Sequence, residues 1–291
     1  MTRENIETPG PNMDIYSSAY LAEYYEIIIN SILVPSDTSA YWTAYKNMMS
    51  LRTLDGPTAT YLVIDVGTGN GRIIREMATA VANAGLNLHT TEFIGLDTSQ
   101  HMLDRAASIP IKPKPASVSW IHGSAVELAS MPPFDKGVRK ADLLVFGFGS
   151  ISHLWRDGEA EQFLRQITFI LRPYTGRAYI SVHDNLTEGN QKEEPPLLDE
   201  TPSKSFPNII YRKVDGEHIV NGNRCTTKAF FEATKDVNDE RHIVEKAQID
   251  MDLRLWGKND ISNLASQCGL SLVDTVKGEE ETLLNMWKVR L

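Results

Sequence analysis

The sequence predicts an α/β fold built on a mostly parallel sheet, and three observations lead to this prediction. Residues 61–72 have the pattern of a buried strand, a tight glycine turn and the start of a helix. Further apolar strands alternate with helical patterns as far as residue 184, which is typical of parallel sheets with crossover helices. Three extended runs within residues 209–256 are separated by turn residues and predict an antiparallel insertion.

The stretch 61–72 carries the most information about function, because its apolar strand ends abruptly in three glycines. Glycines let the backbone approach a ligand closely, and the N-terminus of the following helix offers unpaired N–H groups. The stretch therefore predicts the binding of a nucleotide-like cofactor. The alternative is a structural turn between strand and helix that binds nothing.

The spacing of these glycines argues against a dinucleotide, because the pattern G-x-G-x-x-G would need a third glycine where Arg72 stands. The observed pattern, D-x-G-x-G-x-G, resembles motif I of the class I S-adenosylmethionine-dependent methyltransferases. By this resemblance Asp65 faces the ammonium group of the cofactor's methionine, and the glycines line the sulfonium and the ribose. The cofactor-binding residues expected in this stretch are Asp65, Gly67, Thr68, Gly69, Gly71 and Arg72.

Asp97 ends the next predicted strand, at the edge of the sheet where ligands bind in doubly wound folds. A carboxylate in this place can accept hydrogen bonds from both hydroxyl groups of a ribose. Residues 95–103 also resemble the G-x-D-x-S-x-x-M-L signature of the same methyltransferases, which implies cofactor contacts by Asp97, Thr98 and Met102. The alternative role for Asp97 is to cap the helix that follows, for which Ser99 is equally suited.

The third predicted strand, 118–122, is followed by Gly123, Ser124 and Ala125. The family often has Gly-Asp-Ala here, with the aspartate at the adenine amine, so the resemblance assigns these three residues to the cofactor. Ser124 replaces the aspartate, and its hydroxyl group can still hydrogen-bond adenine. We expect His122, at the end of the strand, to be a packing residue rather than a catalyst.

The turn after the fourth predicted strand contains Gly147, Phe148, Ser150 and His153. Its Gly-Ser-x-x-His-Leu pattern resembles the Gly-Asn-Ser-Phe-x-His-Leu segment of glycine and sarcosine N-methyltransferase-like enzymes, with serine in place of asparagine. By this resemblance Gly147 and Phe148 contact the cofactor. Ser150 and His153 are expected to contact the acceptor, with His153 as a candidate general base and a purely structural histidine as the alternative.

The fifth predicted strand, 177–184, ends in His183 and Asp184 at the same edge of the sheet. An imidazole beside a carboxylate can act as a general base, so His183 is a second catalytic candidate and Asp184 a candidate for acceptor binding. The alternative is that both residues cap the chain at the end of the strand.

Residues 14–56 are predicted to form an N-terminal helical lid, preceded by a flexible tail at 1–13. The first helix resembles the tyrosine-rich stretch that folds over the cofactor in many small-molecule methyltransferases, although Glu26 stands where that pattern usually has aspartate. The candidates for substrate binding on this helix are Tyr16, Tyr20 and Tyr24. Ordinary core packing of these tyrosines is the alternative.

Residues 57–291 are predicted to form the methyltransferase core, and no repeat or second domain is expected. The resemblance implies the Rossmann-like class I fold, with a seven-stranded, mostly parallel sheet. The antiparallel insertion is placed at about 185–257, between strands five and six. Such an insertion is suited to roof an acceptor pocket, and covering a sheet edge or making a subunit contact is the alternative.

The composition restricts the partners and the compartment. A net charge of −9 argues against a protein whose main partner is nucleic acid. Cys225 and Cys268 lack metal-binding spacing, and no metal cofactor is expected. The sequence shows neither a signal peptide nor a stretch of about 18 apolar residues, so we expect a cytoplasmic monomer or homodimer without membrane contact.

Together these features predict an enzyme that transfers a methyl group from S-adenosylmethionine to nitrogen, oxygen or carbon of a small molecule, such as a secondary metabolite. The second product is S-adenosylhomocysteine. Two alternatives are left open. The same fold can retain the cofactor while catalysing a cyclisation, a pericyclic reaction or a rearrangement without methyl transfer. A non-catalytic binding or regulatory protein is the other alternative.

Overall fold

The computed structural model describes residues 12–13, 15–32, 38–52, 60–137, 139–183, 200–238, 240–257, 259–277 and 281–288. These residues divide into two compact units. The larger unit comprises the described residues of Pro35–Lys192 and Arg254–Leu291, and the smaller unit comprises those of Met1–Val34 and Glu193–Leu253. Each unit has its own sheet and its own apolar core.

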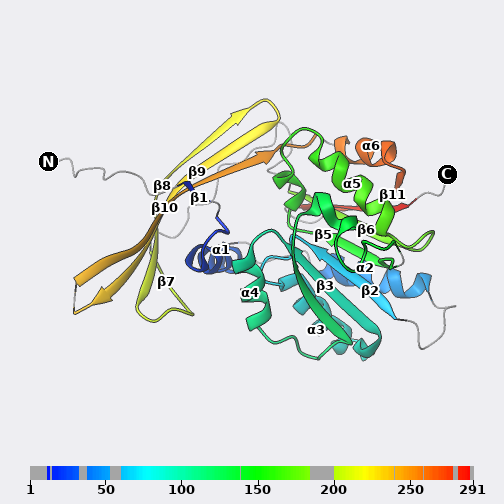
Figure 1. Cartoon of the computed structure of the whole chain (residues 1–291), viewed down its shortest axis with the longest axis horizontal. Helices are drawn as coiled ribbons and strands as arrows, with labels where there is room; N and C mark the ends of the chain where they lie inside the picture. Colours follow the sequence, from blue (N-terminus) through cyan, green and yellow to red (C-terminus); the bar gives the residue numbers. More distant parts are fainter. Residues whose placement is uncertain are drawn as a thin grey trace. The chain divides into compact units, whose positions relative to one another are not determined.

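The larger unit is built on a seven-stranded sheet with the order β11-β12-β6-β5-β2-β3-β4 (Figure 1). Its strands are β2 (Tyr61–Val66), β3 (Thr91–Asp97), β4 (Ser117–His122), β5 (Leu143–Phe146), β6 (Arg177–His183), β11 (Leu270–Lys277) and β12 (Glu281–Lys288). The strands from β6 to β4 are parallel, whereas β12 pairs antiparallel with both β6 and β11. The Rossmann-like α/β fold is thus confirmed, with its parallel part limited to five strands.

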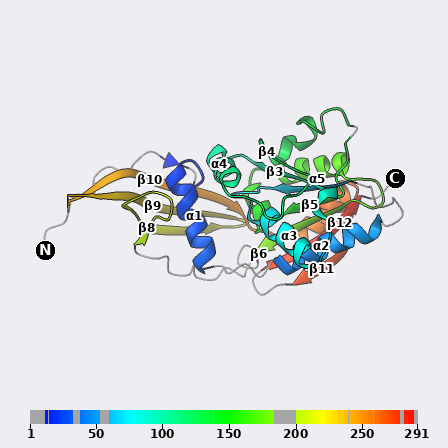
Figure 2. The same ribbon diagram turned by 90° about the horizontal axis from the view of Figure 1, so that it is seen from below.

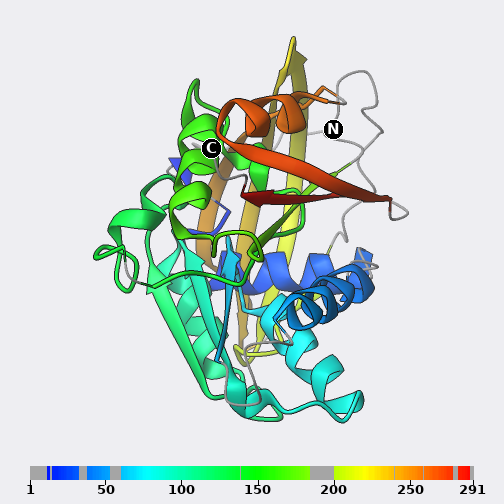
Figure 3. The same cartoon turned by 90° about the vertical axis from the view of Figure 1, so that its right-hand side faces the viewer.

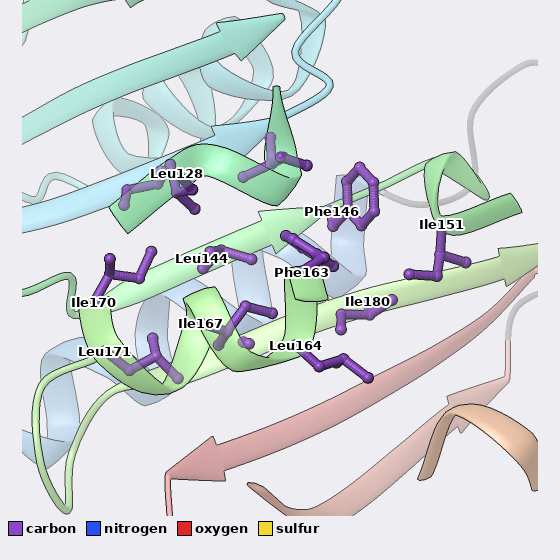
Figure 4. Close-up of a cluster of buried hydrophobic side chains, with 14 of the residues drawn as sticks. Leu128, Leu144, Phe146, Ile151, Phe163, Leu164, Ile167, Ile170, Leu171 and Ile180 are labelled. Atoms are coloured by element: carbon purple, nitrogen blue, oxygen red, sulfur yellow. The ribbon is translucent and has the colours of Figure 1, made fainter. Parts of the chain in front are cut away.

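Helices cover both faces of this sheet, because successive residues of its strands alternate between two apolar clusters. The helices are α2 (Thr38–Leu51), α3 (Arg72–Asn83), α4 (Gln100–Ser108), α5 (Glu159–Ile170), α6 (Asp260–Gln267) and the 3-10 helices η2 (Leu88–Thr90), η3 (Ala125–Ser130) and η4 (Ser150–His153). Leu62 and Ile64 join the cluster that contains residues of α5, α6 and η3, whereas Tyr61 and Val63 join the one that contains residues of α2 and α3. Figure 3 shows the larger unit from the side, with helices around its strands. Figure 4 shows the first cluster where α5 meets β5 and β6.

The order of the strands places a topological switch at β2. From β2 the chain continues through β3 and β4 on one side, and it then returns to the other side of β2 with β5 and β6. In open α/β sheets, ligands bind outside the carboxyl ends of the strands at such a switch. Here those ends lead into the glycine turn after β2 and into the turn after β5.

The smaller unit contains a five-stranded sheet with the order β1-β10-β9-β8-β7 and the helix α1 (Figure 2). Its elements are β1 (Asn12–Met13), α1 (Ala19–Ile32), β7 (Thr201–Pro202), β8 (Ile209–Asn221), β9 (Arg224–Val237) and β10 (Glu240–Arg254). Leu21, Tyr24 and Ile27 of α1 share a buried cluster with apolar residues of β8, β9 and β10. The three extended runs predicted as an insertion are therefore strands, and they form a sheet separate from that of the larger unit.

The N-terminal region differs in two ways from the boundaries expected from the sequence. Asn12–Met13 of the expected tail form β1, which pairs with Gln248 and Ile249 of β10, and residues 1–11 lie outside the described residues. The expected lid is divided, because α1 belongs to the smaller unit and α2 to the larger one. Apolar periodicity predicts both helices, but it does not say which sheet each helix packs on.

Candidate active site

The turn after β2 has a backbone shape that glycine adopts more readily than any other residue. Gly67, Gly69 and Gly71 have φ angles of +62°, +54° and +78°, in the left-handed region that side chains disfavour. The N–H group of Thr68 donates to the carbonyl oxygen of Leu96 at 2.9 Å. This bond ties the glycine turn to the neighbouring strand β3.

Asp65 lies within β2, directly before this turn, and is only 1% exposed. Its Oδ2 accepts a hydrogen bond of 2.7 Å from the hydroxyl group of Thr68. The carboxylate of Asp65 therefore helps to hold the turn. Its expected contact with the ammonium group of a cofactor stays a prediction.

Asp97 ends β3 and connects two parts of the site. Its Oδ2 accepts the N–H group of Gly69 at 2.8 Å, and its Oδ1 accepts the N–H group of Ser99 at 2.8 Å. Ser99 is the residue that caps α4, because its Oγ accepts the N–H group of Met102 at 3.2 Å. A carboxylate offers about four acceptor positions, so these two backbone bonds are compatible with further bonds to ribose hydroxyl groups.

The turn after β5 meets the glycine turn. A Cβ atom placed on Gly67 would have Cε2 of Phe146 and Oγ of Ser150 as its nearest neighbours, both at 3.3 Å. The turn is anchored from β6, since the N–H group of Gly149 donates to Oγ of Ser181 at 2.9 Å. The structure thus brings Ser150, predicted on the acceptor side, to Gly67, predicted on the cofactor side.

Arg72 and Phe148 connect the same two turns by a cation–π contact. Arg72 opens α3, and its Cζ lies 5.7 Å from the centroid of the Phe148 ring. Its Nη1 also pairs with Oε2 of Glu76 at 3.0 Å. Phe148 has a φ angle of +53°, which is uncommon for a residue other than glycine. Both predicted cofactor residues therefore lie at the switch between β2 and β5.

The residues after β4 reach back to the end of β3. The N–H group of Gly123 donates to the carbonyl oxygen of Asp97 at 2.9 Å. Nε2 of His122 lies 2.9 Å from the carbonyl oxygen of Thr98, so His122 makes a structural contact between two strand ends. Oγ of Ser124 accepts an N–H group of the following turn at 3.4 Å and caps η3. A hydrogen bond from Ser124 to adenine would therefore have to coexist with this cap.

Two aromatic residues that the sequence analysis did not select pack against these glycines. A Cβ atom on Gly71 would lie 2.6 Å from Cη2 of Trp120, in β4. A Cβ atom on Gly147 would lie 2.5 Å from the hydroxyl oxygen of Tyr41, in α2. Gly71 and Gly147 therefore have packing reasons to be glycine, in addition to any contact with a cofactor.

The structure describes the side chain of only one of the two histidines predicted as catalysts. His153 is the last residue of η4, and its side chain is exposed. His183 is the last residue of β6 and pairs with Glu281 of β12. The side chain of His183 and the whole of Asp184 lie outside the described residues. The acceptor-side pair of His183 and Asp184 stays a prediction.

Tyr16, Tyr20 and Tyr24, predicted to bind substrate, belong to the smaller unit. The ring of Tyr24 lies 5.1 Å from that of Phe231, and the ring of Tyr20 lies 4.8 Å from that of Phe206. Burial raises the pKa of Tyr24 to about 12. Tyr20 and Tyr24 therefore make the core contacts named as the alternative to substrate binding, and their contact with a substrate stays a prediction.

Comparison with known proteins agrees with this geometry. The family of methyltransferase domains matches residues 63–174, from β2 to beyond the end of α5. Over 269 residues the chain is 28% identical to the N-methyltransferase FrzE of Cladobotryum sp, with 90% of this chain and 92% of that protein covered. Over residues 63–174 the chain is thus similar to methyltransferase domains.

Solved structures share the fold of this chain. The sugar N-methyltransferase KedS8 from Streptoalloteichus sp matches with a TM-score of 0.61 at 13% identity, covering 99% of both chains. CalS10 from Micromonospora echinaspora, an amino pentose methyltransferase solved with S-adenosylmethionine bound, matches with a TM-score of 0.60 at 13% identity. That match covers 95% of this chain and 99% of CalS10. At such identities the likeness concerns the fold alone.

The residues around the glycine turn fit S-adenosylmethionine. Apart from the chain neighbours of Gly69, no atom of the described residues lies within 4 Å of a Cβ position on this glycine, so this part of the turn has room for a ligand. Asp97 presents oxygen acceptors beside Gly69, and the buried Asp65 adds negative charge near a site for a positively charged molecule. Over the described ranges, no cluster of His, Cys, Asp and Glu is arranged to hold a metal ion, and no helix is long and apolar enough to cross a membrane.

Proposed function

We propose that this protein transfers a methyl group from S-adenosylmethionine to a nitrogen atom of a small-molecule amine. The observation that carries the proposal is the carboxylate of Asp97, which joins the end of β3 to the open glycine turn after β2. The choice of nitrogen is supported by FrzE, the N-methyltransferase that is 28% identical to this chain. The sugar N-methyltransferase KedS8 and the amino pentose methyltransferase CalS10 support a small acceptor.

In this proposal the cofactor is held across the carboxyl ends of β2 and β3. When bound, S-adenosylmethionine supplies a methyl group on a positively charged sulfur, and a nitrogen lone pair can displace that sulfur in line. Asp97 accepts the ribose hydroxyl groups, and Asp65 attracts the ammonium group of the methionine. Gly69 lets the backbone come close to the ligand, because it has no side chain there. Positioning of this kind supplies about 7–11 kcal/mol in favourable intramolecular reactions.

The acceptor side is assigned to η4. Ser150 opens this 3-10 helix beside Gly67, where its hydroxyl group is suited to orient an amine. His153 ends the same helix, and we assign it the removal of a proton from the ammonium form of the acceptor. A positioned general base accelerates a reaction by about 10²–10⁴-fold. His183 and Asp184 are the second candidates for this role.

The test is to incubate the purified full chain with methyl-labelled S-adenosylmethionine and a panel of small amines, alcohols and carbon acids. We expect label in an amine product, with S-adenosylhomocysteine formed in equal amount, by mass spectrometry. Label found only in products methylated at oxygen or carbon would contradict the choice of nitrogen. Cofactor binding without any labelled product would favour a fold that uses the cofactor without consuming it.

Matched variants separate the acceptor side from the rest of the sheet edge. His153→Ala should lower the turnover number by about 10²–10⁴-fold while leaving cofactor affinity unchanged, because the imidazole is assigned to the acceptor. His101→Ala, at an exposed position of α4, is the control and should leave turnover unchanged. A turnover number of His153→Ala equal to that of the parent removes His153 from the mechanism.

A further inference from the structure

Arg254 and Trp256 of the larger unit form a stacked pair that has no part in the proposed transfer. Arg254 ends β10, and its Cζ lies 4.5 Å from the centroid of the Trp256 ring. Stacking on an indole holds the planar guanidinium group, and with it the direction of its N–H donors. The pair is therefore a fixed feature of the larger unit.

Each member of this pair has a buried N–H group without a hydrogen-bond partner. Trp256 is 1% exposed, and no described residue accepts a hydrogen bond from its Nε1. Nε of Arg254 is buried in the same way, and within the described ranges nothing accepts its hydrogen. Proteins pair most of their buried donors, so two stacked side chains whose buried donors have no partner among the described residues indicate a contact from outside those residues.

Other arginines of the protein show what Arg254 lacks. Arg241 lies in the same strand, and its guanidinium pairs with Glu200 at 2.6 Å and with Asp236 at 3.3 Å. Arg52 of the larger unit pairs with Asp142 at 2.9 Å. Arg254 has no such ion pair with any carboxylate of the described residues. Its positive charge therefore has no balancing carboxylate among the described residues.

We propose that Arg254 and Trp256 bind an oxyanion, either a carboxylate or a phosphoryl group, on the methyl acceptor. Two N–H donors and a positive charge suit an anionic oxygen, whereas they repel an ammonium group or a metal ion. Trp256 belongs to the large apolar cluster that also contains Ile151 of η4 and Val182 of β6, and the proposal places the anion of the acceptor on this face of the sheet. The assignment of the anion to the acceptor rests on the proposed function, but anion binding does not.

The test is an NMR titration of the full chain labelled with ¹⁵N, in which the indole N–H resonance of Trp256 is followed. Sodium acetate and sodium phosphate are added in separate titrations, and sodium chloride at matched ionic strength is the control. We expect a saturable downfield shift of this resonance with at least one oxyanion, and only a weaker shift with chloride. Chloride also accepts hydrogen bonds, but it lacks the separate oxygen atoms that match the planar guanidinium group. A shift with acetate alone identifies a carboxylate site, and a shift with phosphate alone identifies a phosphoryl site.

Variants test whether Arg254 supplies the binding charge. Arg254→Met should abolish the saturable shift, and Arg254→Lys should weaken it, because lysine keeps the charge but lacks the planar donors. Arg241→Met removes the same charge from the same strand and should leave the shift intact. The indole N–H resonance of Trp256 is identified by its disappearance from the spectrum of Trp256→Phe. If that variant does not fold, the resonance is identified by sequential assignment of the parent chain.

Two results would overturn the proposal: a Trp256 resonance that neither oxyanion shifts saturably, and a shift that is unchanged in Arg254→Met. The titration requires no methyl transfer, so its outcome is independent of the proposed reaction. If the oxyanion binds but no labelled product forms in the incubation with labelled cofactor, the anion-binding site is supported. Only its assignment to a methyl acceptor is then rejected.

Discussion

The two ends of the parallel sheet hold aspartates in opposite ways. At the amino end, Oδ1 of Asp142 pairs with Arg52 at 2.9 Å and with Arg172 at 2.6 Å, and Asp142 is 1% exposed. At the carboxyl end, Asp97 is half-buried and accepts backbone N–H groups of Gly69 and Ser99. The first carboxylate is neutralised within the protein, whereas the second faces a turn that has room for a ligand.

This difference teaches how to separate structural carboxylates from ligand-binding ones in a sheet of this kind. A carboxylate between two arginines has its charge balanced by the protein itself, so removing it is expected to lower the free energy of unfolding. A carboxylate that accepts backbone N–H groups of a turn beside open space is placed to bind a ligand, so we expect its loss to act mainly on ligand affinity. Glu23 of the smaller unit is also held by the protein itself, but by neutral donors: it is fully buried and accepts hydrogen bonds from Tyr211 and from N–H groups of Lys204 and Ser205.

The largest effect on stability is expected at the amino end of the sheet, at Asp142. Asp142→Ala should lower the free energy of unfolding by about 3–5 kcal/mol, because it leaves the buried charge of Arg52 without its partner. Denaturant unfolding measures this change. The control is Glu161→Ala, which removes an exposed ion pair with Arg165 within α5 and should cost at most about 0.5 kcal/mol. Equal losses of unfolding free energy in Asp142→Ala and Glu161→Ala would contradict the structural role assigned to Asp142.

The next largest effect is expected on cofactor binding at the carboxyl end of the sheet, at Asp97. Asp97→Ala should weaken binding of S-adenosylhomocysteine by about 10- to 100-fold, since hydrogen bonds to a charged group contribute about 1.5–3 kcal/mol and 1.4 kcal/mol corresponds to tenfold. Isothermal titration calorimetry measures the affinity. Asp104→Ala, in the helix that follows and exposed, is the matched control and should leave the affinity unchanged. Unchanged affinity in Asp97→Ala would remove Asp97 from the ribose role.

A matched pair of tyrosines sharpens the comparison in the smaller unit. The hydroxyl group of Tyr211 donates to Oε2 of Glu23 at 2.6 Å, so Tyr211→Phe should lower the free energy of unfolding by about 1.5–3 kcal/mol. The hydroxyl group of Tyr24 is buried and has no partner among the described residues, so Tyr24→Phe should change it by less than about 0.5 kcal/mol. Denaturant unfolding at neutral pH compares the two. A loss in Tyr24→Phe as large as in Tyr211→Phe would contradict this account.

The smallest effect appears at alkaline pH. Burial raises the pKa of Tyr24 to about 12, above the usual value of about 10, so the unfolded chain loses this proton at lower pH than the folded chain. The contribution of Tyr24 to stability is therefore complete below about pH 10 and is lost as the pH rises toward 12. Unfolding free energies measured across this range should fall less steeply in Tyr24→Phe than in the parent. Identical slopes would show that Tyr24 does not titrate as its burial implies.

Much of the fold is predictable from the sequence because it depends on local patterns. The apolar run 61–66 predicts β2, its glycines predict the turn, and alternation in 249–255 predicts a long strand of the smaller sheet. The anchoring of Gly149 by Ser181 has a weaker signal, which is a serine in an otherwise apolar strand. Such a pattern shows that the serine is buried, but not which backbone group it binds.

Contacts between distant residues are not predictable in this way. No local pattern connects Asp142 with Arg52, because only the folded chain brings these side chains together. Arg254 and Trp256 are two residues apart, but the sequence does not show that their N–H groups are buried without a partner among the described residues. Position in a strand can nominate Asp97 as a binding residue. Only the structure shows that this carboxylate also holds the glycine turn in place.

The indole of Trp120 constrains how this site can evolve. A Cβ atom on Gly95, in the middle of β3, would lie 2.5 Å from Cε3 of Trp120, and one on Gly71 would lie 2.6 Å from Cη2 of the same ring. Any lineage that enlarges residue 95 must therefore first, or at the same time, shrink residue 120. The order of mutations matters here, so Gly95 and Trp120 should show epistasis and be replaced together among distant relatives.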